Sequence, residues 1–221
     1  MALSTNMEPI FTVALLGSVV FTAVAAIISV CLARWLGKQC SSGDKLTISW
    51  LLWDCIVHCS LEALFLIVSL SGTVQDSTHW TLATWREYGK ADKRFLVSDP
   101  TIVSMAMPTV AVCGPLCVAL IYSIIRQCAY RHWLQVALCV CELYGGWMTF
   151  CPELLTGGHN LATDNPLYFW FYVVFFNGLW VAAPAMLLHQ SWTRCSVSHT
   201  PPSSDNGFTA VIQRRPHMKG D

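Results

Sequence analysis

The sequence predicts an all-α membrane protein, a bundle of about five transmembrane helices. The chain of 221 residues is 54% hydrophobic and only 12% charged, whereas a soluble domain usually carries about 25% charged residues. Its mean hydropathy is +0.50. The apolar residues also gather in runs of about 20, the length that crosses about 30 Å of hydrocarbon. The 13 Lys and Arg balance the 13 Asp and Glu, so the net charge gives no sign of a nucleic-acid partner, and we expect none.

The predicted spans lie near residues 9–32, 46–71, 101–125, 133–155 and 166–188. The first span is too long for a signal peptide and lacks its basic start and small-residue cleavage site, so we expect it to be retained. The fourth span has the weakest pattern, because it contains Glu142, two glycines and a proline. An odd number of spans places the two termini on opposite sides of the membrane.

The distribution of basic residues predicts the orientation, because cytoplasmic loops carry an excess of Lys and Arg. One face of the membrane holds nine basic residues, in the 32–45 and 126–132 loops and in the C-terminal tail. The other face holds four, all in the 72–100 connection. We therefore expect a lumenal N-terminus and a cytosolic C-terminus. None of the 11 cysteines lies in a loop on the oxidising side, so no disulfides are expected.

Three segments organise the chain. Residues 1–45 form an N-terminal transmembrane helix and loop, and residues 46–190 form a four-helix membrane domain. Residues 191–221 are polar and rich in Pro and Ser, which predicts a disordered cytosolic tail. In the 72–100 connection, Trp80, Trp85 and Tyr88 suit a segment that lies along the membrane surface with its charges facing water.

Three ionisable residues lie inside the second span. Asp54, His58 and Glu62 follow one another at steps of four, which places them on one ridge of a helix. A charge at the bilayer centre costs at least about 2.5 to 3.5 kcal/mol on insertion scales, so the ridge must face other helices or a hydrated cavity. Periodicity leaves two interpretations open: a buried network that ties helices together, or a site that handles protons or a ligand. A proton relay in a transporter has only this ridge in its favour, since paired broken helices are absent.

Other polar residues in the spans are explained as interhelical hydrogen bonds, which is the usual role of Glu142 and Asn177 at such positions. Trp180 lies three residues after Asn177 on a similar face, where an aromatic ring could stabilise a cation. His58 and Glu62 are two ligands and do not make a tetrahedral set, so the sequence predicts no metal site. We also expect no cofactor.

A resemblance now adds to this interpretation. The stretches VHCSLEALF, WREYGKADKRFLVSD, CGPL, ELYGG and NPLYFWFYVVFFNGLW occur in the order typical of the emopamil-binding protein family, known also by its EXPERA domain. The best-known member of this family is the Δ8-Δ7 sterol isomerase. The resemblance covers residues 49–189, about two thirds of the chain. It implies five transmembrane helices around a sterol cavity, in the endoplasmic reticulum membrane.

The resemblance also implies roles for single residues. The isomerase protonates a ring double bond and removes a proton elsewhere, using a His and two Glu, while a Trp and an Asn shelter the cation. His58 matches the histidine and Glu62 matches one of the two glutamates. Trp180 and Asn177 match the residues that shelter the cation. The second glutamate is replaced by Ala106 in this sequence. Thr109 lies about one helical turn further along and is expected to line the same pocket.

The missing glutamate decides the functional prediction. Losing a general acid or base typically costs about 10² to 10⁴ in rate. Asp54 and Glu142 are carboxylates where the isomerase has uncharged residues, and either is a candidate substitute. We therefore predict a non-catalytic or weakly active paralogue of the isomerase that binds a sterol-like lipid. The alternative is an active cholestenol Δ-isomerase-like enzyme that uses His58, Glu62 and a substitute carboxylate. The expected partners are the lipid bilayer, a sterol-like ligand and a second copy of the chain, paired through small residues such as Gly145 and Gly146.

Overall fold

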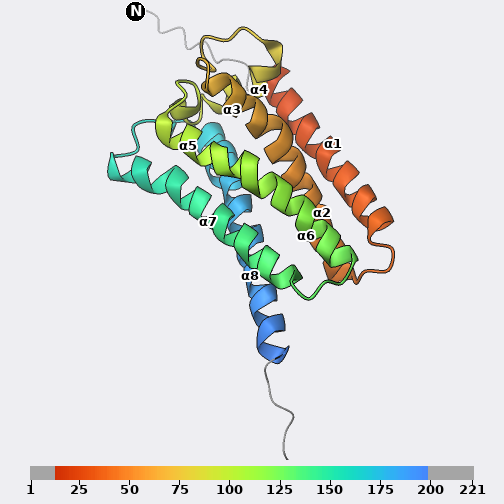
Figure 1. The fold of residues 1–221 in the computed structure, drawn as a ribbon. Coiled ribbons are helices and arrows are strands. Elements are labelled where there is room, and N and C mark those ends of the chain that lie inside the picture. The colour runs from red at the N-terminus through yellow and green to blue at the C-terminus, as the bar shows by residue number, and fades with distance from the viewer. Residues whose placement is uncertain (1–12, 199–221) are drawn as a thin grey trace, which may run out of the picture.

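The structure, a computed structural model, describes residues 13–198, and side chains are described for residues 16–196. Within this range the chain is an all-α bundle without strands, which confirms the predicted fold class (Figure 1). Five helices in the described part are long and apolar enough to cross a membrane. They are built from α1 (Val13–Leu36), α2 (Ser42–Ile56) with η1 (Val57–Glu62) and α3 (Ala63–Ser69), α5 (Pro100–Pro108) with η4 (Thr109–Cys113) and α6 (Gly114–Ile125), α7 (Arg131–Leu155), and η5 (Leu167–Phe176) with α8 (Asn177–Ser198).

The helix ends follow local chemistry. The side chain of Ser41 accepts a hydrogen bond from the backbone N–H of Asp44 at the start of α2, and Asp99 does the same for Thr101 at the start of α5. Pro100 occupies the first helical position of α5, where a missing N–H costs nothing. The largest difference from the expected boundaries is at the C-terminal end. The helix α8 continues to Ser198, so residues 191–198 are helical and not part of a disordered tail, while residues 199–221 of that predicted tail lie outside the described residues.

Three of the long helices contain a stretch of π-helix, in which the hydrogen bonds span five residues. The stretch η4 begins directly after Pro108, whose missing N–H interrupts the α-helical ladder. The stretch η1 carries both His58 and Glu62. Gly114 follows η4, and a Cβ atom there would lie 2.9 Å from Sγ of Cys59. The lack of a side chain at Gly114 thus lets η1 approach the second π-helical stretch.

One end of the bundle is filled by apolar side chains. The helices pack in the pairs α1 with α2, α2 with α6, α6 with α7, and α7 with α8. Ile48 and Leu51 from α2, Leu120 from α6 and Leu138 from α7 are fully buried in one cluster. Close packing of this kind, rather than the hydrophobic effect, holds helices together in lipid. The other end of the bundle is less completely filled and contains the cavity described below.

The connection between the second and third long helices covers this other end. We call residues 72–99 the cap segment. It contains the short helices η2 (Trp80–Leu82), α4 (Ala83–Tyr88) and η3 (Lys93–Phe95), and α4 lies beside one end of α1 (Figure 1). The indole N–H of Trp85 donates to the backbone oxygen of Leu61, and Ser98 bonds Ser69, so the segment is attached to the helix below it.

The expectation that the charges of the cap segment face water is wrong for three of them. Glu87, Asp92 and Arg94 are buried. Arg94 makes a bidentate ion pair with Asp92, through Nε at 2.9 Å and Nη2 at 2.6 Å, and its Nε lies 3.5 Å from Oε2 of Glu153 on α7. Burial by itself would lower the pKa of the Arg94 guanidinium, but the hydrogen bond and charge of Asp92 raise it above its ordinary value. The guanidinium therefore remains charged and joins the cap segment to the bundle.

Candidate functional site

A cavity lies between the cap segment and the helices below it. Its lining is largely apolar and includes Trp85, Tyr88 and Phe95 from the cap segment. Seven of the eight candidate site residues also line it, namely His58, Glu62, Ala106, Thr109, Glu142, Asn177 and Trp180. The eighth, Asp54, is fully buried and lies against His58. The structure therefore brings together residues from four of the five long helices.

The ridge predicted from periodicity is confirmed, with the imidazole in the middle. Nε2 of His58 lies 3.1 Å from Oδ1 of Asp54, and Nδ1 lies 2.8 Å from Oε2 of Glu62. The Nδ1 contact is a hydrogen bond, whereas Nε2 makes no hydrogen bond among the described residues. His58 is 1% exposed, and Glu62 is partly accessible at the cavity wall. Both nitrogen atoms of the ring are thus paired with carboxylates from the same helix.

Asp54 is held by two further groups from other helices. The indole N–H of Trp180 donates to Oδ1 of Asp54 at 3.0 Å, and the thiol of Cys117 donates to Oδ2 at 3.3 Å. The indole ring of Trp180 also packs against those of Trp50 and Trp53, with ring centroids 6.0 and 5.0 Å away. Asp54 therefore fixes the position of the tryptophan that the resemblance assigned to the shelter of a cation.

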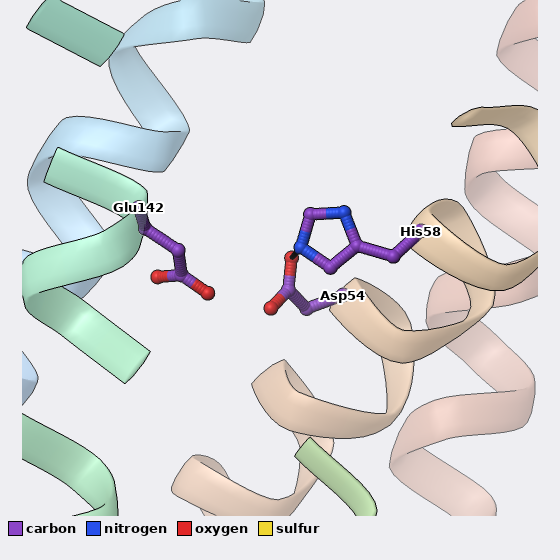
Figure 2. Close-up of side chains that lie close together, drawn as sticks. All are labelled: Asp54, His58 and Glu142. Carbon is purple, nitrogen blue, oxygen red and sulfur yellow. Dashed lines mark ion pairs between the residues drawn. The ribbon is translucent and has the colours of Figure 1, made fainter. Parts of the chain in front are cut away.

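Glu142 projects from α7 toward this pair. Figure 2 shows its carboxylate pointing across the gap to His58 and Asp54, which come from the opposite helix. One ligand atom from each of the three residues lies within 4.8 Å of the other two. Glu142 is 3% exposed, and neither of its oxygen atoms has a hydrogen-bond partner among the described residues. Its nearest polar neighbour on another helix is the carboxylate of Asp54, so the interhelical contact expected for Glu142 from the sequence is made with a second acidic side chain.

Asn177 does make an interhelical hydrogen bond. Its Nδ2 donates to the hydroxyl oxygen of Tyr88 at 2.9 Å and to the backbone oxygen of Val173 at 2.8 Å. Burial of the hydroxyl raises the pKa of Tyr88 above its usual value, so this group stays protonated. The amide therefore connects α8 to the cap segment at the cavity wall.

Position 106 contains no group that transfers a proton. Ala106 is 3% exposed and packs with Phe65, Phe95 and Ile102 in an apolar cluster beside the cavity. The hydroxyl of Thr109 donates to the backbone oxygen of Ala106 at 3.0 Å, so its proton is already used within the helix. This wall of the cavity is apolar where the resemblance implies a glutamate.

Sequence reasoning missed several residues of the site. Cys117 was not among the candidate residues, and Trp85 and Tyr88 were assigned to the membrane surface although their side chains reach the cavity. Gly145 and Gly146 also line the cavity, where added Cβ atoms would contact Met105 and Val181 at 3.8 and 3.7 Å. Both glycines are half-buried and contact other helices of the same chain. The signal in the sequence was that Trp85 and Tyr88 lie in the WREYGKADKRFLVSD stretch and the two glycines in the ELYGG stretch, both of which carry the resemblance.

Fold and site together define a multi-pass membrane protein with an interior cavity that contains buried acid–base groups. The family model EXPERA (EXPanded EBP superfamily) matches residues 80–191, and the chain belongs to this family. The chain is similar to the 3-beta-hydroxysteroid-Delta(8),Delta(7)-isomerase of Mus musculus, with 30% identity over 147 residues, 66% of this chain and 63% of the mouse protein. A probable isomerase of the same name from Arabidopsis thaliana is 33% identical over 163 residues, 72% of this chain and 71% of that protein.

Relatives with another named activity are also similar. The isomeliandiol synthase of Ailanthus altissima is 26% identical over 155 residues, which is 70% of this chain and 72% of that protein. The chain spans less than two thirds of the mouse relative's length. Membership of the family follows from these matches, whereas the activity of this chain has to be argued from its own cavity.

Proposed function

We propose that this chain is a protein of the endoplasmic reticulum membrane that binds a sterol-like lipid in its cavity and has little or no isomerase activity. The relatives named above as sterol isomerases support the ligand class, and the apolar lining of the cavity suits such a ligand. The proposed loss of activity rests on the state of the two proton-transfer positions. Position 106 is an alanine, and both ring nitrogens of His58 face carboxylates.

The chemistry explains why this pair matters. Isomerisation of a ring double bond requires one group that donates a proton to carbon and another that removes a proton, each within hydrogen-bond reach. His58 has Asp54 at one ring nitrogen and Glu62 at the other, so each nitrogen faces a carboxylate of its own helix and neither is directed freely into the cavity. Ala106 provides no second acid or base. The set of proton-transfer groups is therefore incomplete, and one of its members is restrained.

A second candidate function is favoured by one observation. The carboxyl group of Glu142 lines the cavity near His58 and has no hydrogen-bond partner among the described residues. A carboxyl group in that position could take the place of the absent glutamate, which would make the chain an active isomerase with a rearranged site. Under this second function, Glu142→Gln abolishes an activity that the wild type possesses.

Expression in cells that lack their own Δ8-Δ7 isomerase tests the proposal. We expect wild-type protein to give no measurable conversion of a Δ8 sterol and Ala106→Glu alone to give little. The double variant Ala106→Glu with Asp54→Asn should give measurable product, because it restores the acid and releases Nε2 of His58. The expected difference is large, since one general acid or base contributes about 10² to 10⁴ in rate.

The same preparations test the ligand. Protein purified in detergent should contain a sterol-like lipid by mass spectrometry, and a bulky Ala106→Trp substitution in the cavity wall should reduce the amount. Efficient conversion by the wild type would overturn the proposed loss of activity and favour the second function. Absence of any sterol-like lipid, with equal recovery of folded protein, would overturn the ligand class.

We propose further that the N-terminus is lumenal, that the C-terminus is cytosolic, and that two copies associate. The basic loops at 32–45 and 126–132 support this orientation. Gly145 and Gly146, the small residues expected to support pairing, are half-buried and also line the cavity.

A further inference from the structure

Asp54, His58 and Glu142 together offer three atoms that could bind a metal ion, one more than the two ligands that the sequence indicated. The expectation of no metal site considered His58 and Glu62 alone. In the structure a different set converges: Nε2 of His58, a carboxylate oxygen of Asp54 and a carboxylate oxygen of Glu142, all within 4.8 Å of one another (Figure 2). These residues are 1%, 0% and 3% exposed. Three buried potential ligands from two helices thus face a common point.

Several atoms at this point make no geometrically good hydrogen bond, although Nε2 of His58 lies 3.1 Å from Oδ1 of Asp54. Nε2 of His58 and both oxygen atoms of Glu142 are buried and make no hydrogen bond within the described part of the chain. A buried polar group without a partner costs about 1 to 3 kcal/mol, and more when it is charged. Glu142 is directed toward the other two side chains rather than away from them (Figure 2). A cation bound by all three side chains would satisfy both oxygen atoms of Glu142 and the lone pair of Nε2.

Neighbouring groups hold the ligands as they do at known metal sites. A histidine that binds a metal almost always donates its other ring N–H to a carboxylate or carbonyl, which fixes the ring and its tautomer. Nδ1 of His58 makes this contact with Glu62 at 2.8 Å, which leaves the lone pair of Nε2 directed toward Asp54 and Glu142. Asp54 is oriented in turn by the N–H of Trp180 and the thiol of Cys117.

The charge of these three side chains favours a divalent cation as the ligand. Two carboxylates and a neutral imidazole carry a charge of −2, which a single divalent cation cancels; the negative charge of Glu62, whose side chain is 21% exposed, remains at the cavity wall. Electroneutrality matters here because the group lies inside a membrane-spanning bundle, where net charge is costly. We propose that Asp54, His58 and Glu142 bind one divalent transition metal ion, with zinc as the best match to one imidazole and two carboxylates.

The geometry requires a small closure. Ligand atoms around a tetrahedral zinc ion with bonds of about 2.1 Å lie roughly 3.4 Å apart, whereas the upper separation here is 4.8 Å. Nε2 of His58 and Oδ1 of Asp54 are already 3.1 Å apart, so the proposed site requires Glu142 to move toward this pair. Three protein ligands leave a fourth position, which faces the cavity because His58 and Glu142 both line it. This site goes beyond the proposed lipid binding and does not depend on it.

Metal analysis of the full-length protein tests the site. Protein purified in detergent without chelator and dialysed against micromolar Zn²⁺ should retain about one zinc ion per chain. The substitutions Asp54→Asn and Glu142→Gln should each reduce the zinc content at least tenfold, and Glu62→Gln should weaken zinc affinity about 10- to 100-fold. The exposed carboxylate of Asp76 provides the matched control, and Asp76→Asn should leave the zinc content unchanged.

A second measurement does not rely on variants. Replacement of zinc by Co²⁺ should give the intense visible absorption of a tetrahedral cobalt site in the wild-type protein, and Zn²⁺ should displace it. Failure to retain zinc, absence of that absorption, or equal zinc content in the wild type and Glu142→Gln would each overturn the proposal. A protein that contains the sterol-like lipid but no zinc would contradict the metal site and not the proposed function. A protein that contains zinc but no such lipid would contradict the proposed ligand and not the metal site.

Discussion

Gly114 lies where the two π-helical stretches of the site approach each other. A Cβ atom at this position would lie 2.9 Å from Sγ of Cys59 and 3.7 Å from Cβ of His58. We expect Gly114→Val to lower the free energy of unfolding by about 1 to 3 kcal/mol, because the added methyl groups overpack this contact. Unfolding in increasing concentrations of a denaturing detergent measures the change.

The control for this substitution is Gly178→Val. Gly178 is also helical, and nothing lies within 4 Å of a Cβ atom added there. Combining Gly114→Val with Cys59→Ala should recover part of the lost stability, because it removes the nearest atom. Equal stability of the Gly114 and Gly178 variants would show that η1 and η4 do not depend on this close approach.

Some site residues could be predicted from the sequence and others could not, for a physical reason. Asp54, His58 and Glu62 are neighbours on one helix, so their spacing alone predicted their contact. The bonds from Trp180 and Cys117 to Asp54 join residues separated by 126 and 63 positions. Such contacts depend on how helices are rotated against each other, and a single helix's periodicity carries no information about its neighbour's rotation.

Arg94 attaches the cap segment to the rest of the molecule through Asp92 and Glu153. Removing one partner of a buried ion pair leaves the others uncompensated and typically costs about 3 to 5 kcal/mol. We expect Arg94→Met to lower the free energy of unfolding in detergent by about 3 to 5 kcal/mol, and therefore to lower the melting temperature. The same substitution should speed proteolysis of the cap segment. A melting curve and a time course of limited digestion measure the two effects.

Lys93 provides the control, since it is adjacent and exposed. Lys93→Met should leave both measurements close to those of the wild type. An Arg94→Met protein that melts and is digested like the wild type would show that the buried ion pairs do not hold the cap segment.

The helices themselves were largely predictable, since the length of an apolar run reports directly on a span. The cap segment was not. Its charges suggested exposure to water, but Arg94 and Glu153 are 59 positions apart and satisfy each other only after the chain has folded. The C-terminal end of α8 was missed because residues 191–198 are polar, and polarity alone does not distinguish a helix that leaves the membrane from an unfolded tail.

The bundle as a whole predicts an orientation in the membrane. The turn after α1 and the turn before α7 lie at the end of the bundle opposite to the cap segment (Figure 1). Three of the four basic side chains of the cap segment are already engaged, since Arg86 bonds two backbone oxygens, Lys90 pairs with Glu87, and Arg94 is buried. The basic residues near the turn at 37–41 are therefore the stronger orienting signal.

Single glycosylation acceptor sites test this orientation. An Asn-x-Thr sequence inserted in the cap segment near residues 75–79 should be glycosylated in cells, because the proposed orientation places this end in the lumen. The same insertion in the turn at 37–41 should not be glycosylated. The opposite pattern would mean that the whole bundle is inverted.

The polar ridge also has a consequence for biosynthesis. An aspartate near the centre of a membrane helix costs about 2.5 to 3.5 kcal/mol on insertion scales. The indole that binds Asp54 belongs to a residue made 126 positions later. At about 5 to 20 residues per second, the ribosome needs roughly 6 to 25 s to reach it. Until then Asp54 lacks this partner, so we expect the second span to be less stable in the membrane during synthesis than in the folded bundle.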